Sequence, residues 1–255
     1  FAAGDERLYL RVGTNMNEEK LLYENSKHAL QSDNIIAITN RHLCSRPFME
    51  QLERVCKLHP HAIVLREKDM PEAEYLSLAR DVIALCKKYD VQCMLHSFIN
   101  VAMELEHPYI HLPLPILEAY VKKNVSGNIS TGMSKSTDNY QQFFKVIGTS
   151  VHSVEDAIKA EQLGATYMTA GHIFATDCKK GLPPRGLDFL KNVCDAVGIP
   201  VYAIGGINIA SGDDSTASDS PSTYDAMPDI SVPRLSEVME CGAAGGCIMS
   251  GMMRV

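Results

Sequence analysis

Residues 146–186 read VIGTSVHSVEDAIKAEQLGATYMTAGHIFATDCKKGLPPRG, and this stretch decides the fold. The short β-branched run at 145–149 predicts a strand, and the Ser153-x-x-Asp156 pattern after it is typical of a helix N-terminus. The segment TYMTAG, whose strand we place at 166–170, follows that helix, and a glycine- and lysine-rich loop ends the stretch. A strand, a helix and a second strand in this order form the repeating unit of a parallel sheet.

The helix between these strands carries an apolar stripe at the 3.6-residue spacing of a face that packs on a sheet. We expect that face to consist of Val154, Ala157, Ile158 and Ala165. Because side chains along a strand alternate, Ser150 and His152 share one side of the preceding strand if the extended geometry persists that far. His152 then stands at the carboxyl end of a strand, where parallel α/β proteins place their chemistry.

The same alternation of strands and helices extends outward along the chain. Eight segments read as strands, at 35–39, 62–67, 91–95, 109–113, 145–149, 166–170, 201–206 and 246–250. Helical patterns separate nearly all of them, among them 47–58, 98–106, 187–197 and 233–241. Parallel strands need such crossovers, so the pattern predicts a single α/β domain with the (β/α)8 fold of a TIM barrel. A doubly wound Rossmann sheet is the alternative, and it is weaker because no G-x-G-x-x-G follows the first strand.

Three segments stand outside this repeat. Residues 1–33 form a polar N-terminal extension, for which a helix covering the barrel is one interpretation. The barrel itself occupies 34–255, with polar insertions near 126–143 and 208–231 whose glycine-punctuated or acidic sequences are typical of mobile loops. The chain stops five residues after the last predicted strand, so we expect no C-terminal eighth helix.

The composition indicates a globular protein with a substantial core, since 45% of the residues are hydrophobic. A formal net charge of −7 argues against a nucleic-acid-binding surface, so an anionic ligand needs a local cluster of cations and backbone N–H groups. No apolar run approaches the length of a membrane span, and no secretory leader is visible. The eight cysteines include no C-x-x-C pair, and we interpret those inside predicted elements as buried thiols of a cytoplasmic protein: Cys56, Cys86, Cys93, Cys194 and Cys247.

Five motifs on these strands resemble one known group of small barrels. They are LREKD (65–69), GTSVH (148–152), GHIFATDCKKG (171–181), AIGGI (203–207) and IMSG (248–251). In this order they are similar to the thiamine phosphate synthase/thiazole tautomerase superfamily, over roughly residues 34–250 apart from the two insertions. The stretch GHIFATDCKKGLPPRG is closest to the tautomerase branch.

The two branches of this superfamily perform different reactions, and the resemblance implies different residues for each. The chain resembles the synthase at the positions that contact the diphosphate of an aminopyrimidine substrate, namely Arg66, Lys68, Ser150, Thr176 and Lys179. The synthase also holds Mg²⁺ with an Asn-Asp pair after strand three, which is His96-Ser97 here, and with an Asp after strand four, where this chain reads HLPLPI. The glutamine with which the synthase reads the pyrimidine is replaced by Val64 in this chain. Mg²⁺ prefers hard oxygen ligands, so these departures favour the tautomerase branch, which needs no metal.

The resemblance implies a carboxythiazole that carries an ethyl phosphate and an exocyclic double bond as the tautomerase substrate. Moving one proton from the ring carbon to the exocyclic carbon makes the ring aromatic. Histidine suits a group that takes and returns a proton near neutral pH. We therefore predict His152 as the acid/base, in line with the family; the alternative is a histidine that merely caps the following helix.

The substrate anions need partners at the same end of the barrel. Barrels of this kind bind phosphate after strands seven and eight, so we expect backbone N–H groups of Gly205, Gly206, Met249 and Ser250 to hold it. Arg66 could bind the carboxylate bidentately, with Lys68, Lys179 and Lys180 as further candidates. Arg66 shares strand parity with Val64 and Ala62, so burial of those two would direct it inward.

Other patterns carry weaker hypotheses. Cys178 beside lysines could be a reactive thiol, although a bystander is the better interpretation. The Ser150 and His152 pair superficially suggests a hydrolase, but no G-x-S-x-G elbow supports it. His59-Pro-His61, and His107 with His111, show no recognised metal spacing, and we interpret them as structural.

Three functions remain open at this point. The leading one is a metal-free thiazole tautomerase, the second is a Mg²⁺-dependent thiamine phosphate synthase, and the third is a barrel that binds a thiazole phosphate without turnover. The expected partner is a small phosphorylated thiazole, with no nucleic acid and no membrane. A homodimer is compatible with the sequence, which does not determine the oligomeric state.

Overall fold

The structure is a computed structural model that describes residues 34–130, 143–176, 179, 181–210 and 231–255. The predicted N-terminal helix, most of the two insertions, Cys178 and Lys180 lie outside these residues.

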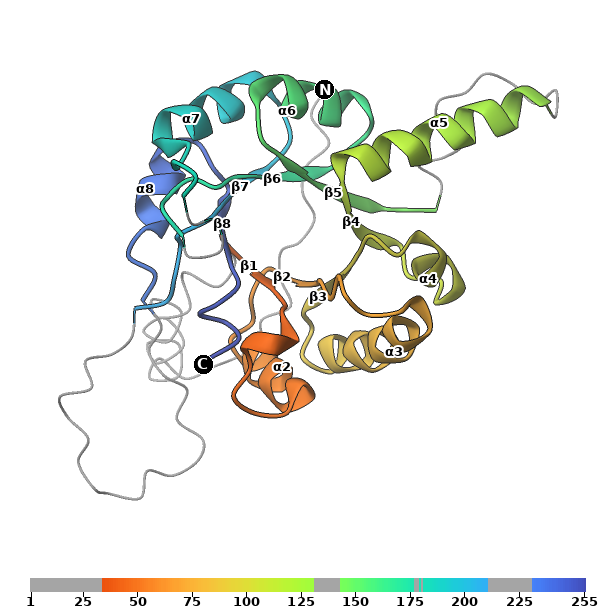
Figure 1. Ribbon diagram of the computed structural model, residues 1–255, viewed down its shortest axis with the longest axis horizontal. Coiled ribbons are helices and arrows are strands. Elements are labelled where there is room, and N and C mark those ends of the chain that lie inside the picture. The colour runs from red at the N-terminus through yellow and green to blue at the C-terminus, as the bar shows by residue number, and fades with distance from the viewer. Residues whose placement is uncertain (1–33, 131–142, 177–178, 180, 211–230) are drawn as a thin grey trace, which may run out of the picture. The chain divides into compact units, whose positions relative to one another are not determined.

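Eight parallel strands close into a barrel in the order of the sequence, with β1 paired to both β2 and β8 (Figure 1). The strands are β1 (Ile35–Ile38), β2 (Ala62–Leu65), β3 (Gln92–His96), β4 (Tyr109–Pro113), β5 (Val146–Val151), β6 (Tyr167–Gly171), β7 (Val201–Ile204) and β8 (Gly245–Ile248). Each connection between consecutive strands contains a helix outside the ring (Figure 1). These helices are α2 (Phe48–Lys57), α3 (Glu72–Lys88), α4 (Ile99–Glu104), α5 (Leu114–Ser130), α6 (Val154–Gln162), α7 (Gly186–Ala196) and α8 (Leu235–Glu240). The predicted TIM barrel is confirmed.

The alternation of side chains along the strands produces two separate hydrophobic cores. One fills the barrel and contains Ile36, Ile38, Ala62, Val64, Met94, Tyr167, Tyr202 and Cys247. The other lies between the strands and the helices, and includes Ile35 and Ala37 of β1 together with Leu52 and Val55 of α2. Successive residues of β1 therefore face opposite layers, which explains why whole strands are buried.

The central strand–helix–strand unit forms as its sequence predicts. The Ser153 hydroxyl caps α6 by accepting a hydrogen bond from the Asp156 N–H at 3.0 Å. Gly164, with a φ of 87°, follows the helix. One detail of the predicted face is wrong: Ala157 is fully buried, but the Ile158 side chain is 39% exposed because it lies beyond the narrow contact stripe.

α5 continues to Ser130, so the first residues of the predicted insertion near 126–143 are helical. One further expectation needs correction. Cys194 is only partly buried on α7, whereas Cys56, Cys86, Cys93 and Cys247 are buried as predicted. Among the described residues, no helix is long and apolar enough to span a bilayer.

Candidate active site at the barrel mouth

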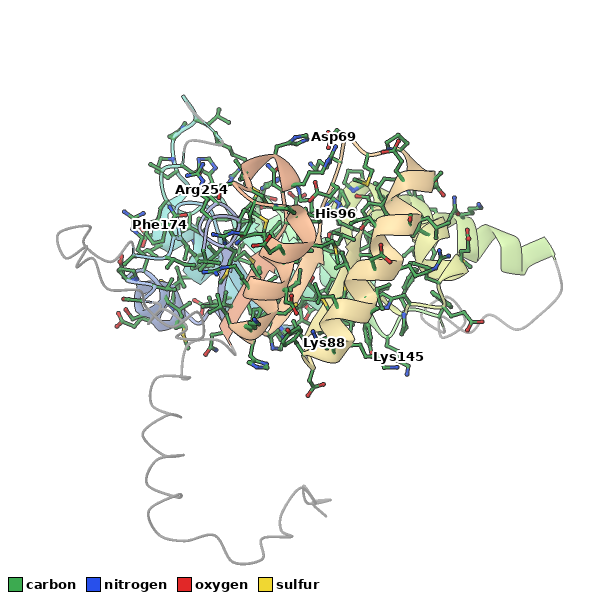
Figure 2. The ribbon with its side chains drawn as sticks, turned by 90° about the horizontal axis from the view of Figure 1, so that it is seen from below. Asp69, Lys88, His96, Lys145, Phe174 and Arg254 are labelled. Carbon is green, nitrogen blue, oxygen red and sulfur yellow. The ribbon has the colours of Figure 1, made fainter. Side chains whose placement is uncertain are left out.

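The predicted site residues lie at the carboxyl ends of the strands. Figure 2 shows Asp69, which follows β2, at one edge of the barrel and Lys88 and Lys145, which precede β3 and β5, at the opposite edge. His96, the last residue of β3, lies between these edges, nearer to Asp69. In a closed parallel barrel this is the end at which side chains from different strands converge on one volume.

A chain of hydrogen bonds joins three neighbouring strands, β4, β5 and β6. The imidazole of His111 on β4 is joined through Nδ1 to the Tyr167 hydroxyl and through Nε2 to the Ser150 hydroxyl, both at 2.9 Å. The Thr169 hydroxyl donates to the Ser150 oxygen at 3.0 Å. Gly148 makes room for this chain, because a Cβ there would lie 2.2 Å from the Tyr167 ring. Ser150 is thus anchored on both sides, and its hydroxyl has a defined position at the barrel mouth.

His96 of β3 packs beside this chain. Its ring stacks on His111 with the centroids 5.7 Å apart and an interplanar angle of 13°, and its Nδ1 lies 2.8 Å from the Ser97 hydroxyl. Burial lowers the pKa of His96 to about 2, with further contributions from His111, Arg66 and Lys68. Burial, together with the charge of Arg66, lowers the pKa of His111 to about 3. Both imidazoles are therefore neutral at physiological pH.

His152 follows β5 at a different part of the rim. Its side chain is exposed, and its Nδ1 lies 2.8 Å from the carbonyl oxygen of Gly171 at the end of β6. A carbonyl only accepts, so Nδ1 carries the proton in the neutral ring and Nε2 is the basic nitrogen. The helix cap is supplied by Ser153 and not by His152, whose backbone N–H bonds to Asp156 at 3.3 Å. The imidazole of His152 is thus oriented by a neighbouring strand.

Three of the predicted cations, Arg66, Lys68 and Lys179, act electrostatically on one another or on the rings at the mouth. Val64 and Ala62 are buried inside the barrel, and Arg66, two residues beyond Val64, acts electrostatically on the interior rings of His96 and His111. Partial burial lowers the pKa of Lys68, and the charges of Arg66 and Lys179 lower it further. Mutual repulsion among these cations is relieved when an anion binds between them.

The predicted phosphate-binding turns lie side by side. β7 pairs with β8, with Ile204 opposite Cys247, so Gly205-Gly206 and the turn at Met249-Ser250 follow adjacent strands. Gly205 has a φ of 101°, and a Cβ on it would lie 2.4 Å from the Cβ of His172. Only glycine fits this close approach of two loops.

The loop after β6 carries the remaining predicted substrate contacts. Thr176 and Lys179, in the loop after β6, are both half-buried, and the charge of Lys179 acts on Lys68. A separate pocket of about 350 Å³ lies beside the N-terminus of α7, between Phe174, Arg185, Asp188 and Arg234. None of the predicted substrate residues lines it. We place the active site at the barrel mouth, where the acid/base candidate and the cations occur.

Comparison with known proteins identifies the family of this barrel. The sequence model of the family described as thiamine monophosphate synthase matches residues 35–219. The chain belongs to this family. It is 35% identical over 173 residues to a putative thiamine-phosphate synthase 2 of Aquifex aeolicus, which covers 68% of this chain and 84% of that protein. It is 29% identical over 174 residues to a thiamine-phosphate synthase of Pyrococcus furiosus, covering 68% and 75% of the two chains.

A solved structure agrees with this assignment. The thiamine phosphate pyrophosphorylase structure from Pyrococcus furiosus has a TM-score of 0.60 and 25% sequence identity, over 88% of this chain and 89% of that one. Both the sequence and the barrel therefore place the protein in the thiamine monophosphate synthase family.

The Mg²⁺ site expected of a synthase in this family does not fit the residues present. The end of β3 carries His96 and Ser97, and both nitrogens of His111 are already hydrogen bonded. Nearby carboxylates are occupied: Glu67 bonds to Thr39 and Arg41, and Asp69 bonds to Arg41. Within the described ranges, no three His, Cys, Asp or Glu side chains cluster as metal ligands would. Proteins hold Mg²⁺ mainly through carboxylate oxygens, and the ends of β3 and β4 carry imidazoles and hydroxyls but no carboxylate.

Sequence reasoning assigned no site role to His96 and interpreted His111 as structural. His107 is structural as expected, because it is buried and its Nε2 bonds to the Cys93 carbonyl at 2.8 Å. His111, by contrast, lies inside the barrel at the centre of the polar chain. The signal was available, because His111 sits two residues from Tyr109 on β4 and therefore shares its inward face.

Proposed function

We propose that the protein is a thiazole tautomerase that aromatises a carboxythiazole ethyl phosphate by a proton shift through His152. The observation that carries the proposal is the hydrogen bond from the His152 Nδ1–H to the Gly171 carbonyl, which leaves Nε2 as the basic nitrogen at the barrel mouth. In the proposed reaction, Nε2 accepts the proton from the ring carbon and returns the same proton to the exocyclic carbon. No redox partner, leaving group or metal is required for this balance.

The charges around the mouth support an anionic substrate of this kind. Partial burial lowers the pKa of Lys68, and the charges of Arg66 and Lys179 lower it further; these three cations would hold the carboxylate. The turns at Gly205-Gly206 and Met249-Ser250 would hold the phosphate through backbone N–H groups. The Ser150 hydroxyl, fixed by His111 and Thr169, would orient the ring between them.

A second candidate is the synthase reaction, in which thiazole phosphate displaces diphosphate from an aminopyrimidine. The names of the similar proteins from Aquifex aeolicus and Pyrococcus furiosus favour it. The side chains at the ends of β3 and β4 do not suit a magnesium site, which argues against the synthase reaction. Diphosphate leaves poorly without a metal ion.

The test compares both reactions with the same protein, with Mg²⁺ and with EDTA. We expect aromatisation of the thiazole tautomer in EDTA, and a loss of at least about a hundredfold in kcat for His152→Asn. His59→Asn is the matched control, since His59 is an exposed histidine that precedes β2 at the opposite end of the barrel. A His152→Asn variant as fast as the parent would refute the assignment of the base. Diphosphate release that depends on Mg²⁺ would establish the synthase, and tight product binding without turnover would indicate a binding protein.

A further inference from the structure

The buried carboxylate of Glu67 lies between two of the proposed substrate-binding cations. Arg66 and Lys68 flank it in the sequence, but the Glu67 side chain is only 1% exposed. Ile63 and Leu65, which share its parity on β2, belong to the core outside the barrel. Glu67 therefore points away from the barrel axis, whereas Arg66 is in phase with Val64 and Ala62, which face the barrel interior.

Several donors hold the Glu67 carboxylate in that direction. The Thr39 hydroxyl donates to Oε1 at 2.6 Å, and the Arg41 guanidinium donates to Oε2 at 3.0 Å. The Arg41 backbone N–H adds contacts of 3.2 Å to both oxygens. These donors belong to the end of β1 and to the short 3₁₀ helix Arg41–Leu43 that follows it. A charged acceptor with this many donors is fixed more firmly than a neutral one.

Thr39 also contacts the backbone of Arg66, the cation next to Glu67. Its hydroxyl oxygen accepts a hydrogen bond from the Arg66 backbone N–H at 2.9 Å while it donates to Glu67. The Thr39 side chain is fully buried, so water cannot replace either bond. One hydroxyl therefore ties the backbone of Arg66 and the side chain of Glu67 to β1.

We infer that Thr39 and Glu67 are positioning residues that set the direction of Arg66 and Lys68 toward the anionic group of the substrate. Neither touches the substrate, because both side chains are buried on the helix side of β1 and β2. Arg41 completes the arrangement from outside, where its guanidinium also pairs with Asp69 at 2.7 Å. The inference rests on the proposed function in assigning the substrate anion to Arg66 and Lys68.

The test measures anion binding, which does not depend on turnover. Inorganic diphosphate without metal is the probe, and its affinity is measured by calorimetry for the parent, Thr39→Val and Thr39→Ser. Valine has the shape of threonine without the hydroxyl, whereas serine retains both hydrogen bonds. We expect Thr39→Val to weaken binding about tenfold, equivalent to about 1.4 kcal/mol, and Thr39→Ser to stay within about twofold of the parent.

A double-mutant cycle separates positioning from general destabilisation. In an Arg66→Gln background, Thr39→Val should weaken diphosphate binding by clearly less than tenfold, because only the contribution of Lys68 remains, although it should still lower the unfolding midpoint. In the turnover assay the same substitution should raise KM and leave kcat unchanged, since His152 follows β5, away from β1 and β2. Equal affinities for the valine and serine variants, or an undiminished tenfold loss in the Arg66→Gln background, would overturn the inference.

A second pair of variants keeps the inference testable if Thr39→Val does not fold. Arg41→Met removes the guanidinium from Glu67 but leaves the backbone N–H contacts, whereas Asp69→Asn perturbs the exposed partner that Arg41 shares with His42 and leaves the contacts of Glu67 intact. We expect Arg41→Met to weaken diphosphate binding severalfold and Asp69→Asn to match the parent. An Arg41→Met variant that binds diphosphate as tightly as the parent and Asp69→Asn would contradict the positioning role. A protein that binds diphosphate as expected but does not aromatise the thiazole would refute the proposed function and leave this inference standing.

Discussion

Acid should destabilise this barrel in a specific pH range, because two neutral imidazoles are buried at its mouth. His96 and His111 have folded-state pKa values of about 2 and about 3, against about 6.5 for a histidine in an unfolded chain. Between these limits the unfolded chain binds protons that the folded protein rejects. The stabilisation is therefore complete above pH 6.5 and is lost progressively as the pH falls toward the folded-state values.

The magnitude follows from linkage. Between pH 7 and pH 5, each histidine that stays neutral in the folded state costs about 2 kcal/mol of unfolding free energy, so the pair costs about 4 kcal/mol. This range lies above the pH at which Asp69 protonates, because Arg41 and His42 hold the pKa of that carboxyl far below its ordinary value. His107, whose pKa burial also lowers, contributes in the same direction.

Urea unfolding at pH 7 and pH 5 measures this loss for the parent and for His96→Asn, whose amide can still bond to the Ser97 hydroxyl. The variant should lose about 2 kcal/mol less than the parent over the interval, because one titrating group is gone and all others are shared. His59→Asn removes an exposed histidine and should keep the full loss. Identical pH dependence in the parent and His96→Asn would refute the reasoning, since it would mean that His96 is protonated equally in both states.

Two further substitutions test the packing around the site. Gly205→Ala places a Cβ 2.4 Å from the Cβ of His172 at a φ of 101°, so it should cost about 3 kcal/mol in urea unfolding, whereas Gly198→Ala, whose nearest atom is 3.4 Å away, should be nearly neutral. Tyr75→Phe removes a buried hydroxyl that donates to the Leu65 carbonyl at 2.6 Å, and it should cost about 2 kcal/mol by the same measurement. A loss for Gly198→Ala equal to that for Gly205→Ala, or an unchanged stability for Tyr75→Phe, would contradict these expectations.

The fold was predictable because strand and helix periods repeat along the chain with little interruption. Each strand is buried on both faces and reads as a short apolar run, and Ser153 and Gly164 mark the ends of α6. α5 was harder, because its last turns continue into a sequence of polar residues and glycine that resembles a loop. Polar residues and glycine occur in the last turns of helices as well as in loops, so the local sequence alone does not fix such a boundary.

The site was predictable only where a strand end is marked by position and residue type together. Arg66 and His152 follow their strands in phase with inward residues, so alternation alone directs them toward the mouth. His96 was not found because the third strand was expected to end at residue 95, whereas β3 includes His96. The hydrogen bonds that join His111 to Tyr167, 56 positions away in the chain, depend on barrel closure and have no local signal.

The two kinds of histidine at this mouth imply a division of roles. His96 and His111 are kept neutral by burial and by Arg66, so they can bind and orient a ligand but cannot supply a proton near neutral pH. His152 is exposed, and its Nδ1 is engaged by a carbonyl that fixes the tautomer. On the proposed function, Arg66 and its neighbours supply the positive charge for the substrate. A site of this composition suits movement of a proton within a bound anion better than departure of a diphosphate, which needs its charge neutralised as the bond breaks.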